Sequence, residues 1–341
     1  MDVARKYPFV KFLPERWVEE FARRKDPVLM SHITGIESPT GARTEGWFIA
    51  LPLTPNQMIK TVPIEEVYRK ITQCCDLGAE LGADICGLGA FTSVVGDGGV
   101  TVAKKSKIKA VTTGNSYTIS TAIEATLRAC KQLEIDLGEA TLAVVGATGS
   151  IGKTCAKILS PHFGHTIVIG RDLDRTQQVA DELVNATASI DVRDVSQADA
   201  IVTVSSAGKE LIMPEYLKPG AIVCDVARPR DVSVRVSKER PDVLVIEGGV
   251  VKVPGDVEFN LNFGFPEKTA YACMSETMML ALDGRIENFT LGKDVSVEQV
   301  EEINRLAHKH GFELSKFRSF EKAVDQEAID RARKARKESR R

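Results

Sequence analysis

The stretch ATLAVVGATGSIGKTCAKIL, residues 140–159, constrains the fold of this chain more than any other segment. It has the pattern of a short apolar strand, a turn containing Gly146, Gly149 and Gly152, and an amphipathic helix. In such a unit one glycine ends the strand, another lets the backbone approach a pyrophosphate, and a third lets the helix pack on the sheet. The free N–H groups at the helix start attract phosphate. The stretch therefore predicts dinucleotide binding, although its first glycine spacing is one residue longer than in G-x-G-x-x-G.

The segments that follow repeat the alternation of apolar strand and helix. They are a strand in HTIVIGRD, a helix in LDRTQQVADEL, and strands in ADAIVTVSSAG, AIVCDVARP and DVLVIEGGVV. Continuous Val/Ile runs with short connections are typical of a parallel, doubly wound sheet that is buried on both faces. We predict an α/β fold of the Rossmann type for this part of the chain.

Segments of the chain precede and follow this unit, so we expect the protein to have three parts. We expect an N-terminal α/β substrate domain over 1–138, a Rossmann domain over 139–265, and C-terminal helices with a basic tail over 266–341. Within the first part we expect one helix over Ile64–Leu81 and another that is capped by Ser116. The C-terminal helices should pack back against the first domain and complete it.

The sequence VIGRD, at the end of the second predicted strand, indicates the cofactor. An NAD enzyme usually places an acid there to accept the ribose 2′-hydroxyl. Here Arg171 takes the position and Arg175 follows one turn on, and guanidinium groups pair well with a 2′-phosphate. Asp172 competes with this interpretation, since it can take the acidic role. We expect NADPH, and the residues expected to bind it are Gly146, Thr148, Gly149, Ser150, Ile151, Gly152, Arg171, Arg175 and Ser205.

Composition and charge narrow the class of protein. Hydrophobic residues make up 43% and charged residues 27% of the chain, and the net charge of −2 argues against a nucleic-acid-binding protein. No apolar leader stands at the start, and no apolar run reaches the roughly 18 residues that span a bilayer. Seven cysteines without a CxxC pair suit free thiols in a reducing cytosol, so we expect a cytoplasmic protein. His308 and His310 are two residues apart rather than four, so no metal site is expected.

Cys273, in AYACMSETMML (270–280), differs from the other six cysteines, which lie in helices or strand-like apolar runs. It follows the turn FGFPEK at the expected start of a helix, beside Lys268 and Tyr271. A thiol there can hold an acyl group, provided that a helix N-terminus or a cation lowers its pKa below the free value of about 8.5. The Met and Leu residues of the same helix indicate burial, so core packing remains the other interpretation.

Six motifs, taken in their order and spacing, resemble those of the long-chain acyl-[acyl-carrier-protein] reductases. They are GLGAFTS, TTGNSYT, VVGATGSIG, EGGVV, YACMSETMML and HGFEL, and the likeness extends from about residue 65 to 315. Members of that family make fatty aldehydes from acyl thioesters with NADPH. The resemblance implies an acyl carrier protein or coenzyme A thioester as the substrate and an aldehyde-consuming enzyme as a partner. The segments before residue 65 and between GGVV and Cys273 look shorter than in that family, which leaves acyl length and carrier open.

The resemblance also implies roles for particular residues. Cys273 would carry the acyl group, and Thr92 and Ser93 would lie near the thioester carbonyl. Gly114 and Asn115 would lie by the nicotinamide, so Asn115 joins the residues expected to bind the cofactor. Ser93 or backbone N–H groups would then hold the oxyanion of the tetrahedral intermediate.

Proton transfer has two candidates near Cys273. Glu276, one turn further along the helix, is either a proton shuttle or an acid on the helix surface. Tyr271 is the second candidate.

Two basic segments each have an ordinary and a functional interpretation. The tail RARKARKESRR (331–341) is either a solvated helix end that frays or a patch that docks an acidic partner or an anionic membrane surface. The run KKSKIK (104–109) is either a solvated edge or a docking site for an acidic carrier protein or coenzyme A phosphates.

Two other functions remain open. One is a shikimate-type NADP-dependent hydroxy/keto dehydrogenase, in which Cys273 only packs, and the other is a cofactor-sensing protein without enzymatic activity. The segment 198–232 is also similar to glutamyl-tRNA reductases. Those enzymes place their cysteine in the N-terminal domain, and this chain has none before Cys74.

Overall fold

The valine- and isoleucine-rich segments after residue 140 form one parallel sheet of six strands in the order β10-β9-β8-β5-β6-β7. The strands are β5 (Thr141–Val145), β6 (His165–Ile169), β7 (Ala186–Ser189), β8 (Ala200–Thr203), β9 (Ile222–Asp225) and β10 (Leu244–Glu247). Counted along the chain, this is the 3-2-1-4-5-6 order of a Rossmann sheet, so the predicted fold class is confirmed. The sequence does not predict β7, because ATAS contains no apolar run.

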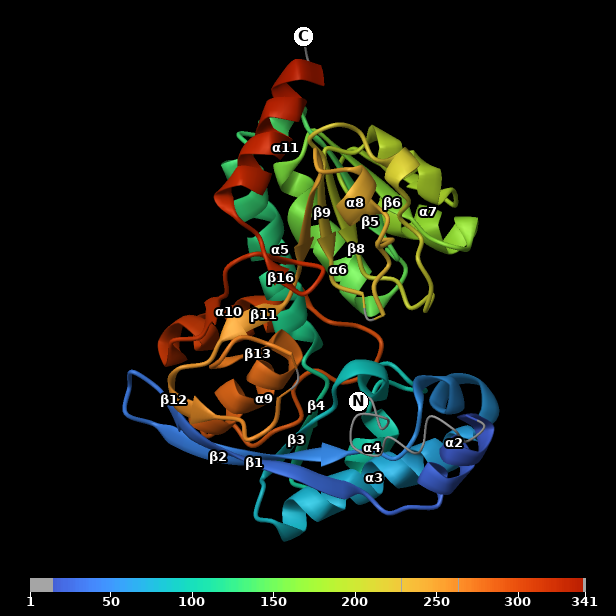
Figure 1. Cartoon of the computed structure of the whole chain (residues 1–341). Helices are drawn as coiled ribbons and strands as arrows, with labels where there is room; N and C mark the ends of the chain where they lie inside the picture. The colour runs from blue at the N-terminus through green and yellow to red at the C-terminus, as the bar shows by residue number, and fades with distance from the viewer. Residues whose placement is uncertain (1–14, 228, 263, 340–341) are drawn as a thin grey trace.

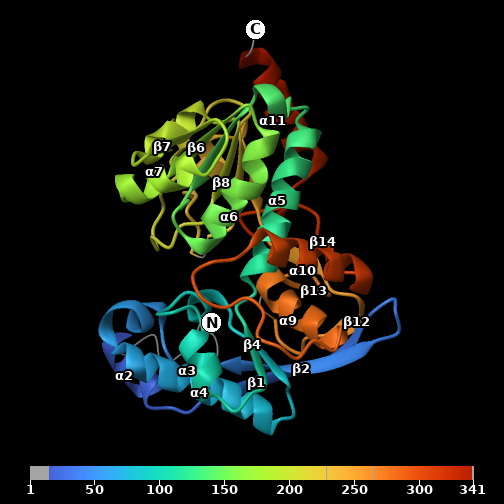
Figure 2. The ribbon, with the colours of Figure 1, turned by 180° about the vertical axis from the view of Figure 1, so that it is seen from behind.

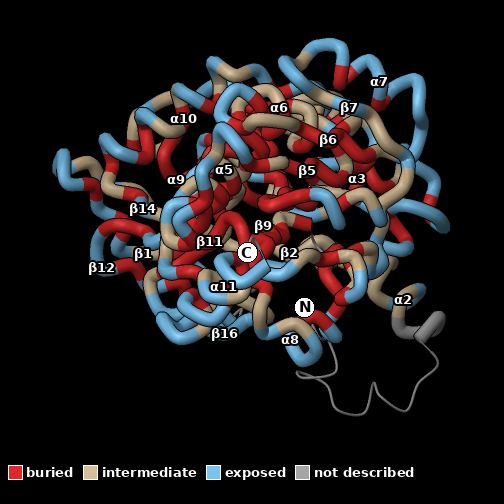
Figure 3. Tube along the Cα trace, turned by 90° about the horizontal axis from the view of Figure 1, so that it is seen from above, coloured by how far each residue is buried: buried red, intermediate tan, exposed pale blue. Residues whose placement is uncertain are grey.

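The structure is a computed structural model that describes residues 15–227, 229–262 and 264–339 (Figure 1). Long helices cover only one face of the six-stranded sheet: α5 (Asn115–Gln132), α6 (Ser150–Leu159) and α7 (Leu173–Asp181). The other face is covered by the short α8 (Val236–Glu239) and by 3-10 turns at Val192–Gln197 and Pro214–Tyr216. Further 3-10 turns lie at Leu137–Glu139 and Ser160–His162. The central strands are therefore buried on both faces (Figure 3).

A second lobe, the lower one in Figure 1, contains three small sheets: β12-β1-β2, β13-β11-β14 and β3-β4. Its strands are β1 (Val28–Glu37), β2 (Arg43–Ala50), β3 (Ile85–Gly87), β4 (Ala110–Thr112), β11 (Val250–Lys252), β12 (Gly255–Glu258), β13 (Thr269–Tyr271) and β14 (Glu313–Leu314). Its helices are α2 (Glu15–Arg23), α3 (Ile64–Glu80), α4 (Val100–Lys105), α9 (Ala272–Leu282) and α10 (Val297–His310), with a π-helix at Gln57–Thr61 and a 3-10 turn at Ala90–Ser93. A hairpin of β15 (Arg318–Ser319) and β16 (Lys322–Ala323) and the final helix α11 (Gln326–Ser339) complete the described chain.

The lower lobe is assembled from both ends of the sequence. β1 pairs with β12, and α9 packs on α5 and β3, so segments from beyond the Rossmann strands pack against the N-terminal part. β11 and β12 also belong to this lobe, since β11 pairs with β13 and β14. The packing therefore places the change of lobe after β10, near Gly248–Gly249, and not at the predicted boundary at 265. We propose a division into two lobes between which the chain crosses three times: along α5, after β10, and between β14 and α11.

Helix α5 connects the two lobes. Tyr117, in its first turn, belongs to the core of the lower lobe, and Ile119 to Cys130 belong to the core of the Rossmann sheet. Seen from behind, α5 runs from the upper lobe down to α9 and α10 (Figure 2). The geometry between the lobes thus depends on one continuous helix rather than on a linker.

The basic tail is docked up to residue 339, so the predicted fraying end is wrong for this described part. Ile329 and Ala332 are buried, and the guanidinium of Arg336, 4% exposed, pairs with Asp199 at 2.6 Å. Gly220 (φ +70°) lies under the helix, where an added Cβ would come within 2.3 Å of the Arg336 Cβ. The other described cations of α11 pair with acids of the same helix or with Glu134. Docking of the tail on an anionic surface stays a prediction.

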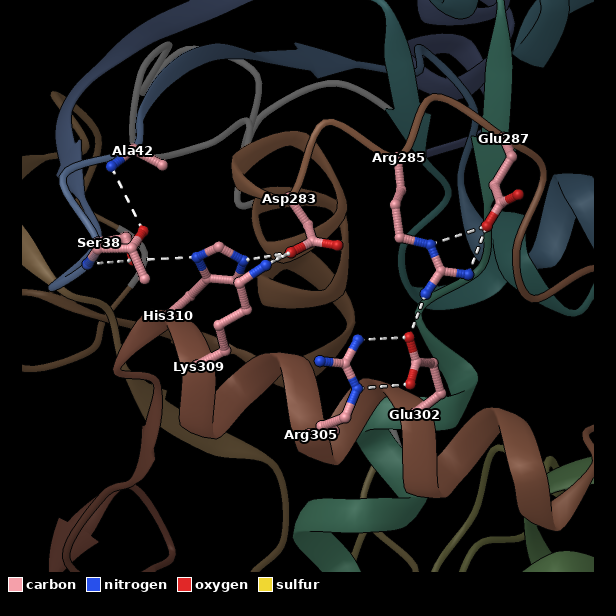
Figure 4. A network of polar contacts seen from close by, with 10 residues as sticks. Ser38, Ala42, Asp283, Arg285, Glu287, Glu302, Arg305, Lys309 and His310 are labelled. Carbon is pink, nitrogen blue, oxygen red and sulfur yellow. Dashed lines mark hydrogen bonds and ion pairs between the residues drawn. The ribbon is translucent and has the colours of Figure 1, made fainter.

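A polar chain fastens the β1–β2 hairpin to α9 and α10 (Figure 4). The His310 ring, 1% exposed, lies between the Ser38 hydroxyl (Nδ1–Oγ 3.0 Å) and the Asp283 carboxylate (Nε2–Oδ1 3.0 Å). Lys309 also pairs with Asp283. Burial pushes the pKa of Asp283 upward, but the hydrogen bonds from Lys309 and His310 outweigh it, so this pKa lies below its ordinary value.

We expect Asp283→Asn to lower the free energy of unfolding by about 1–3 kcal/mol at pH 7, because the negative charge that pairs with Lys309 and accepts from the His310 ring is lost. Since the folded-state pKa of Asp283 is lowered, its contribution is full above the unfolded pKa of about 4 and disappears as the pH falls below it. The difference from wild type should therefore shrink below about pH 4. Denaturant titrations across pH measure this, with the exposed Asp294→Asn as control. A constant difference across the range would contradict the assignment.

Candidate active site

The glycine turn after β5 has the close backbone packing that its sequence predicts. Gly146 is left-handed (φ +85°), and an added Cβ would meet the backbone of Ser205 at 3.1 Å. At Gly152 an added Cβ would come within 2.3 Å of the Gly146 carbonyl oxygen, so this glycine lets α6 pack on the turn. Gly149 is the exposed N-cap residue of α6, and an added Cβ there would meet the Gly146 carbonyl oxygen at 3.4 Å. The approach of a pyrophosphate to this turn stays a prediction.

The N-terminus of α6 offers donors for phosphate. No side chain caps this helix, and the N–H groups of Ser150, Ile151 and Gly152 have no acceptor in the described part of the chain. Thr148 lies beside them, against Gly170 of the next strand end. Free N–H groups and the helix dipole together fit a pyrophosphate, so the residues present suit a dinucleotide.

The end of β6 presents two arginines to solvent. Arg171 and Arg175 are exposed, and neither makes an ion pair with a described residue. Asp172, the competing acid, caps α7 and accepts the N–H of Arg175 at 2.9 Å. One carboxylate oxygen of Asp172 thus has a structural role, while both guanidinium groups stay available beside the glycine turn. This arrangement favours a 2′-phosphate.

Ser205 lies against the glycine turn but donates elsewhere. Its N–H and its hydroxyl both bond to the buried Asp231, at 2.9 and 2.6 Å. Ser205 would therefore contact a cofactor through its backbone atoms near Gly146, and not through its hydroxyl. Asp231 cannot be recognised from the sequence, because a buried aspartate after a strand has no distinctive spacing.

Cys273 lies in the first turn of α9, at the carboxyl edge of the six-stranded sheet. The chain leaves β10 at Glu247, and two residues later the Gly249 carbonyl accepts the Ala272 N–H at 2.7 Å. The glycine turn follows the carboxyl end of β5 in the same parallel sheet. Cys273 and the phosphate-binding turn thus face the same edge, which is where ligands bind in open α/β sheets.

Two backbone segments approach Cys273 closely. Gly114 (φ +73°) touches it, since an added Cβ there would come within 2.3 Å of the Cys273 Cα. The N–H of Ala90, a non-glycine residue in the left-handed region (φ +50°), points to the sulfur. The N–H groups of Met274 and of Cys273 itself also approach it. The sulfur therefore lies among backbone donors from two segments, the turn at Ala90 and the first turn of α9.

The environment raises the pKa of the Cys273 thiol to about 11. Burial is the largest cause and the Glu276 carboxylate is the second, and the three N–H groups oppose the rise only in part. The expectation that a cation lowers this pKa is wrong. Lys268 pairs with the exposed Asp256 at 2.6 Å, and the ring of Tyr271 packs edge-on against Phe265.

Glu276 is fully buried, which excludes the predicted place on the helix surface. One carboxylate oxygen accepts the hydroxyls of Thr112 and Thr290, and the other accepts the Ser116 hydroxyl at 2.6 Å and the Tyr117 N–H at 3.0 Å. Ser116 therefore does not cap α5. The helix begins at Asn115 after a left-handed Gly114, and its cap comes from another helix.

The other expected residues near the sulfur have defined places. The Ser93 hydroxyl donates to the Ala90 carbonyl and the Thr92 hydroxyl to the Gly89 carbonyl, both at 2.7 Å, so they stabilise the turn that presents the Ala90 N–H. Asn115 is 4% exposed, and its side-chain amide makes no hydrogen bond with a described residue. An unpaired amide beside Gly114 and Cys273 is available to a ligand.

Other predicted features carry less chemistry. In the basic run, Lys105 pairs with Glu65 and Lys109 with Asp84, while Lys104 and Lys107 are exposed without an ion pair to any described residue. Across residues 15–227, 229–262 and 264–339, no three His, Cys, Asp or Glu side chains are grouped to hold a metal ion. None of the helices within these ranges is long and apolar enough to span a bilayer.

Comparison with known proteins finds dehydrogenases and reductases. The family model for shikimate/quinate 5-dehydrogenase matches residues 128–247, which include β5 to β10. The chain is 31% identical over 90% of its length to aminotransferase PigE of a Serratia species, of which it spans 37%. It is 27% identical to the long-chain acyl-[acyl-carrier-protein] reductase of Synechococcus elongatus, over 92% of this chain and 94% of that protein. It is also 24% identical to glutamyl-tRNA reductase of Methylococcus capsulatus, over 62% and 50% of the two chains.

These similarities agree with the geometry of the site. A dehydrogenase model covers the Rossmann sheet, and two reductases align along most or much of the chain. Together with the glycine turn, they support an NAD(P)-dependent oxidoreductase whose cofactor is NADP(H).

We expect alkylation of Cys273 by iodoacetamide to accelerate about tenfold per pH unit between pH 7 and 9.5, because only the thiolate reacts. The pKa of about 11 places the plateau above this range. Mass spectrometry of the peptide that contains Cys273 measures the rate, and the buried Cys155 is an internal control. A plateau already reached near pH 8.5 would show an ordinary or activated thiol instead.

Proposed function

We propose that this chain reduces a long-chain fatty acyl thioester, carried by an acyl carrier protein or coenzyme A, to a fatty aldehyde through an acyl-enzyme on Cys273. The observation that carries the proposal is the position of Cys273. Its sulfur lies in the first turn of α9, among backbone N–H groups, at the sheet edge that bears the glycine turn. Similarity to an acyl-[acyl-carrier-protein] reductase along 92% of the chain supports it.

In the first half-reaction Cys273 attacks the thioester carbonyl. A bond forms between its sulfur and the acyl carbon, the bond to the carrier sulfur breaks, and the carrier leaves as a thiol with the proton that Cys273 loses. The N–H groups of Ala90 and Met274 already approach the sulfur, so we assign to them the stabilisation of the developing oxyanion. Ser93 supports this role through its bond to the Ala90 carbonyl and not as the donor itself.

In the second half-reaction the acyl group on Cys273 is reduced. Bound NADPH supplies the hydride. The free N–H groups of residues 150–152 would hold the pyrophosphate, Arg171 and Arg175 the 2′-phosphate, and the Asn115 amide the nicotinamide side. The aldehyde leaves when its carbon–sulfur bond to Cys273 breaks, and the sulfur takes up a proton. We place this reaction in the cytoplasm, next to an enzyme that consumes the aldehyde.

Intact mass measurement tests the first half-reaction directly. Incubation with palmitoyl coenzyme A or a palmitoyl carrier protein, without NADPH, should add one palmitoyl group to the protein. Cys273→Ala should abolish the adduct, and Cys74→Ala should retain it. No adduct with either thioester would exclude the proposal.

One alternative has a specific observation in its favour, the match of residues 128–247 to shikimate/quinate 5-dehydrogenase. A hydroxy/keto dehydrogenase would form no acyl adduct and would reduce a ketone with NADPH at an unchanged rate in Cys273→Ala. The same two measurements therefore separate the functions.

We expect Arg171→Ala and Arg175→Ala each to raise the KM for NADPH about 10- to 100-fold, since each removes a charge-assisted contact to the 2′-phosphate. The KM for NADH should stay unchanged, because NADH lacks that phosphate. Steady-state kinetics with both cofactors measure the effect. A wild-type preference for NADH would instead give the recognition role to Asp172.

A further inference from the structure

Glu276 is a carboxylate in an unusual setting. It is fully buried, and it forms no ion pair with any residue that the structure describes. Removing a carboxylate from water is unfavourable unless hydrogen bonds replace those it made to water. Four hydrogen-bond donors do so here, two to each oxygen. Both oxygens are fully engaged, which leaves no free lone pair directed at a substrate.

The donors come from the end of β4, the first turn of α5 and the connection between α9 and α10. Thr112 ends β4, Ser116 and Tyr117 lie in the first turn of α5, and Thr290 lies between α9 and α10. Thr290 also bonds to Thr112 and Ser116, so the donors contact one another. The carboxylate is therefore the centre of a four-way junction.

Glu276 also replaces a missing helix cap. The N-cap residue of α5 is Gly114, which has no side chain to accept the N–H groups of the first turn. Glu276 accepts the Tyr117 N–H from across the interface, and its charge suits the positive end of an 18-residue helix. A residue of α9 thus caps the N-terminus of α5.

This junction lies next to Cys273. The segment that Glu276 binds on both sides, residues 112–117, includes Gly114, which touches the Cys273 backbone, and Asn115, whose amide is unpaired. Glu276 and Cys273 lie three residues apart on α9, so their side chains are neighbours on the helix. Hydrogen bonds from residues 112–117 to Glu276 therefore also fix the distance between that segment and Cys273.

We propose that Glu276 is a positioning residue: it clamps the turn of residues 112–117 onto the start of α9 and thereby holds Cys273 and Asn115 in register with each other. The purpose of this role, holding the nucleophile in place, rests on the proposed function. The hydrogen bonds themselves do not depend on it. It replaces the proton-shuttle interpretation. The clamp has an electrostatic side effect, because its charge contributes to the raised pKa of Cys273.

The clamp and its charge can be separated by substitution. Glu276→Gln removes the charge and places an amide N–H₂ against the donors. We expect the pH midpoint of Cys273 alkylation by iodoacetamide to move to lower pH, while acyl transfer from palmitoyl coenzyme A slows about 100-fold, as for a misplaced nucleophile. A thiol that is easier to ionise but slower to acylate is a signature that loss of stability alone does not produce.

Donor variants provide a second route if Glu276→Gln does not fold. Ser116→Ala and Thr290→Val each remove one hydrogen bond to Glu276, together with the contact between the two hydroxyls, and keep the charge. We expect each to slow acylation about tenfold, without moving the alkylation midpoint to lower pH. The exposed Glu301→Gln on α10 is the matched control and should behave as wild type in both assays.

The outcomes distinguish this proposal from the proposed function. Folded Glu276→Gln or donor variants that acylate at the wild-type rate would overturn the positioning role. If wild-type protein takes up no acyl group, the proposed function fails, and the alkylation rate of Cys273 in the donor variants at fixed pH then tests the positioning role: a changed rate with an unmoved midpoint supports it, and a wild-type rate overturns it.

Discussion

The arrangement of the site depends on one interaction, the four hydrogen bonds that the buried Glu276 carboxylate accepts. Glu276 joins β4, the start of α5 and the α9–α10 connection, and α5 in turn carries the Rossmann sheet. The lower lobe consists of segments from both ends of the chain. Apolar contacts alone are not directional, so they do not specify how these segments are rotated relative to one another. Directional hydrogen bonds to one buried charge specify that rotation. The same junction determines where Cys273 lies with respect to the cofactor edge.

The two lobes contribute different chemical groups to the carboxyl edge of the six-stranded sheet. The upper lobe offers unpaired N–H groups and two free arginines, a surface suited to phosphates. The lower lobe offers a sulfur among backbone donors, in a setting that keeps it protonated at neutral pH. A protonated thiol does not react without a partner that accepts its proton. In the proposed reaction the departing carrier thiolate would be such a partner, so the thiol would stay unreactive until a thioester is bound.

Local patterns in the sequence predict much of the fold and part of the site. The Val/Ile runs predict five of the six parallel strands, and the glycine spacing predicts the phosphate turn. The polar strand β7 has no such pattern. Ser116 has the residue type of a helix cap, yet its hydroxyl bonds to Glu276, because tertiary packing offered α5 a stronger, charged acceptor. The basic tail has the composition of a solvated end, but Arg336 found a buried partner in Asp199.

Local patterns indicate the strands of the parallel sheet, the dinucleotide turn and the candidate cysteine, because each pattern lies within about twenty neighbouring positions. The backbone donors around that cysteine, the direction in which its pKa moves and the partners of Glu276 follow from tertiary packing. These properties depend on segments that are more than 150 residues apart, such as Ser116 and Glu276, and on burial, which no local pattern encodes. Electrostatic effects act through space and dielectric, so their sign becomes known only when the chain has folded.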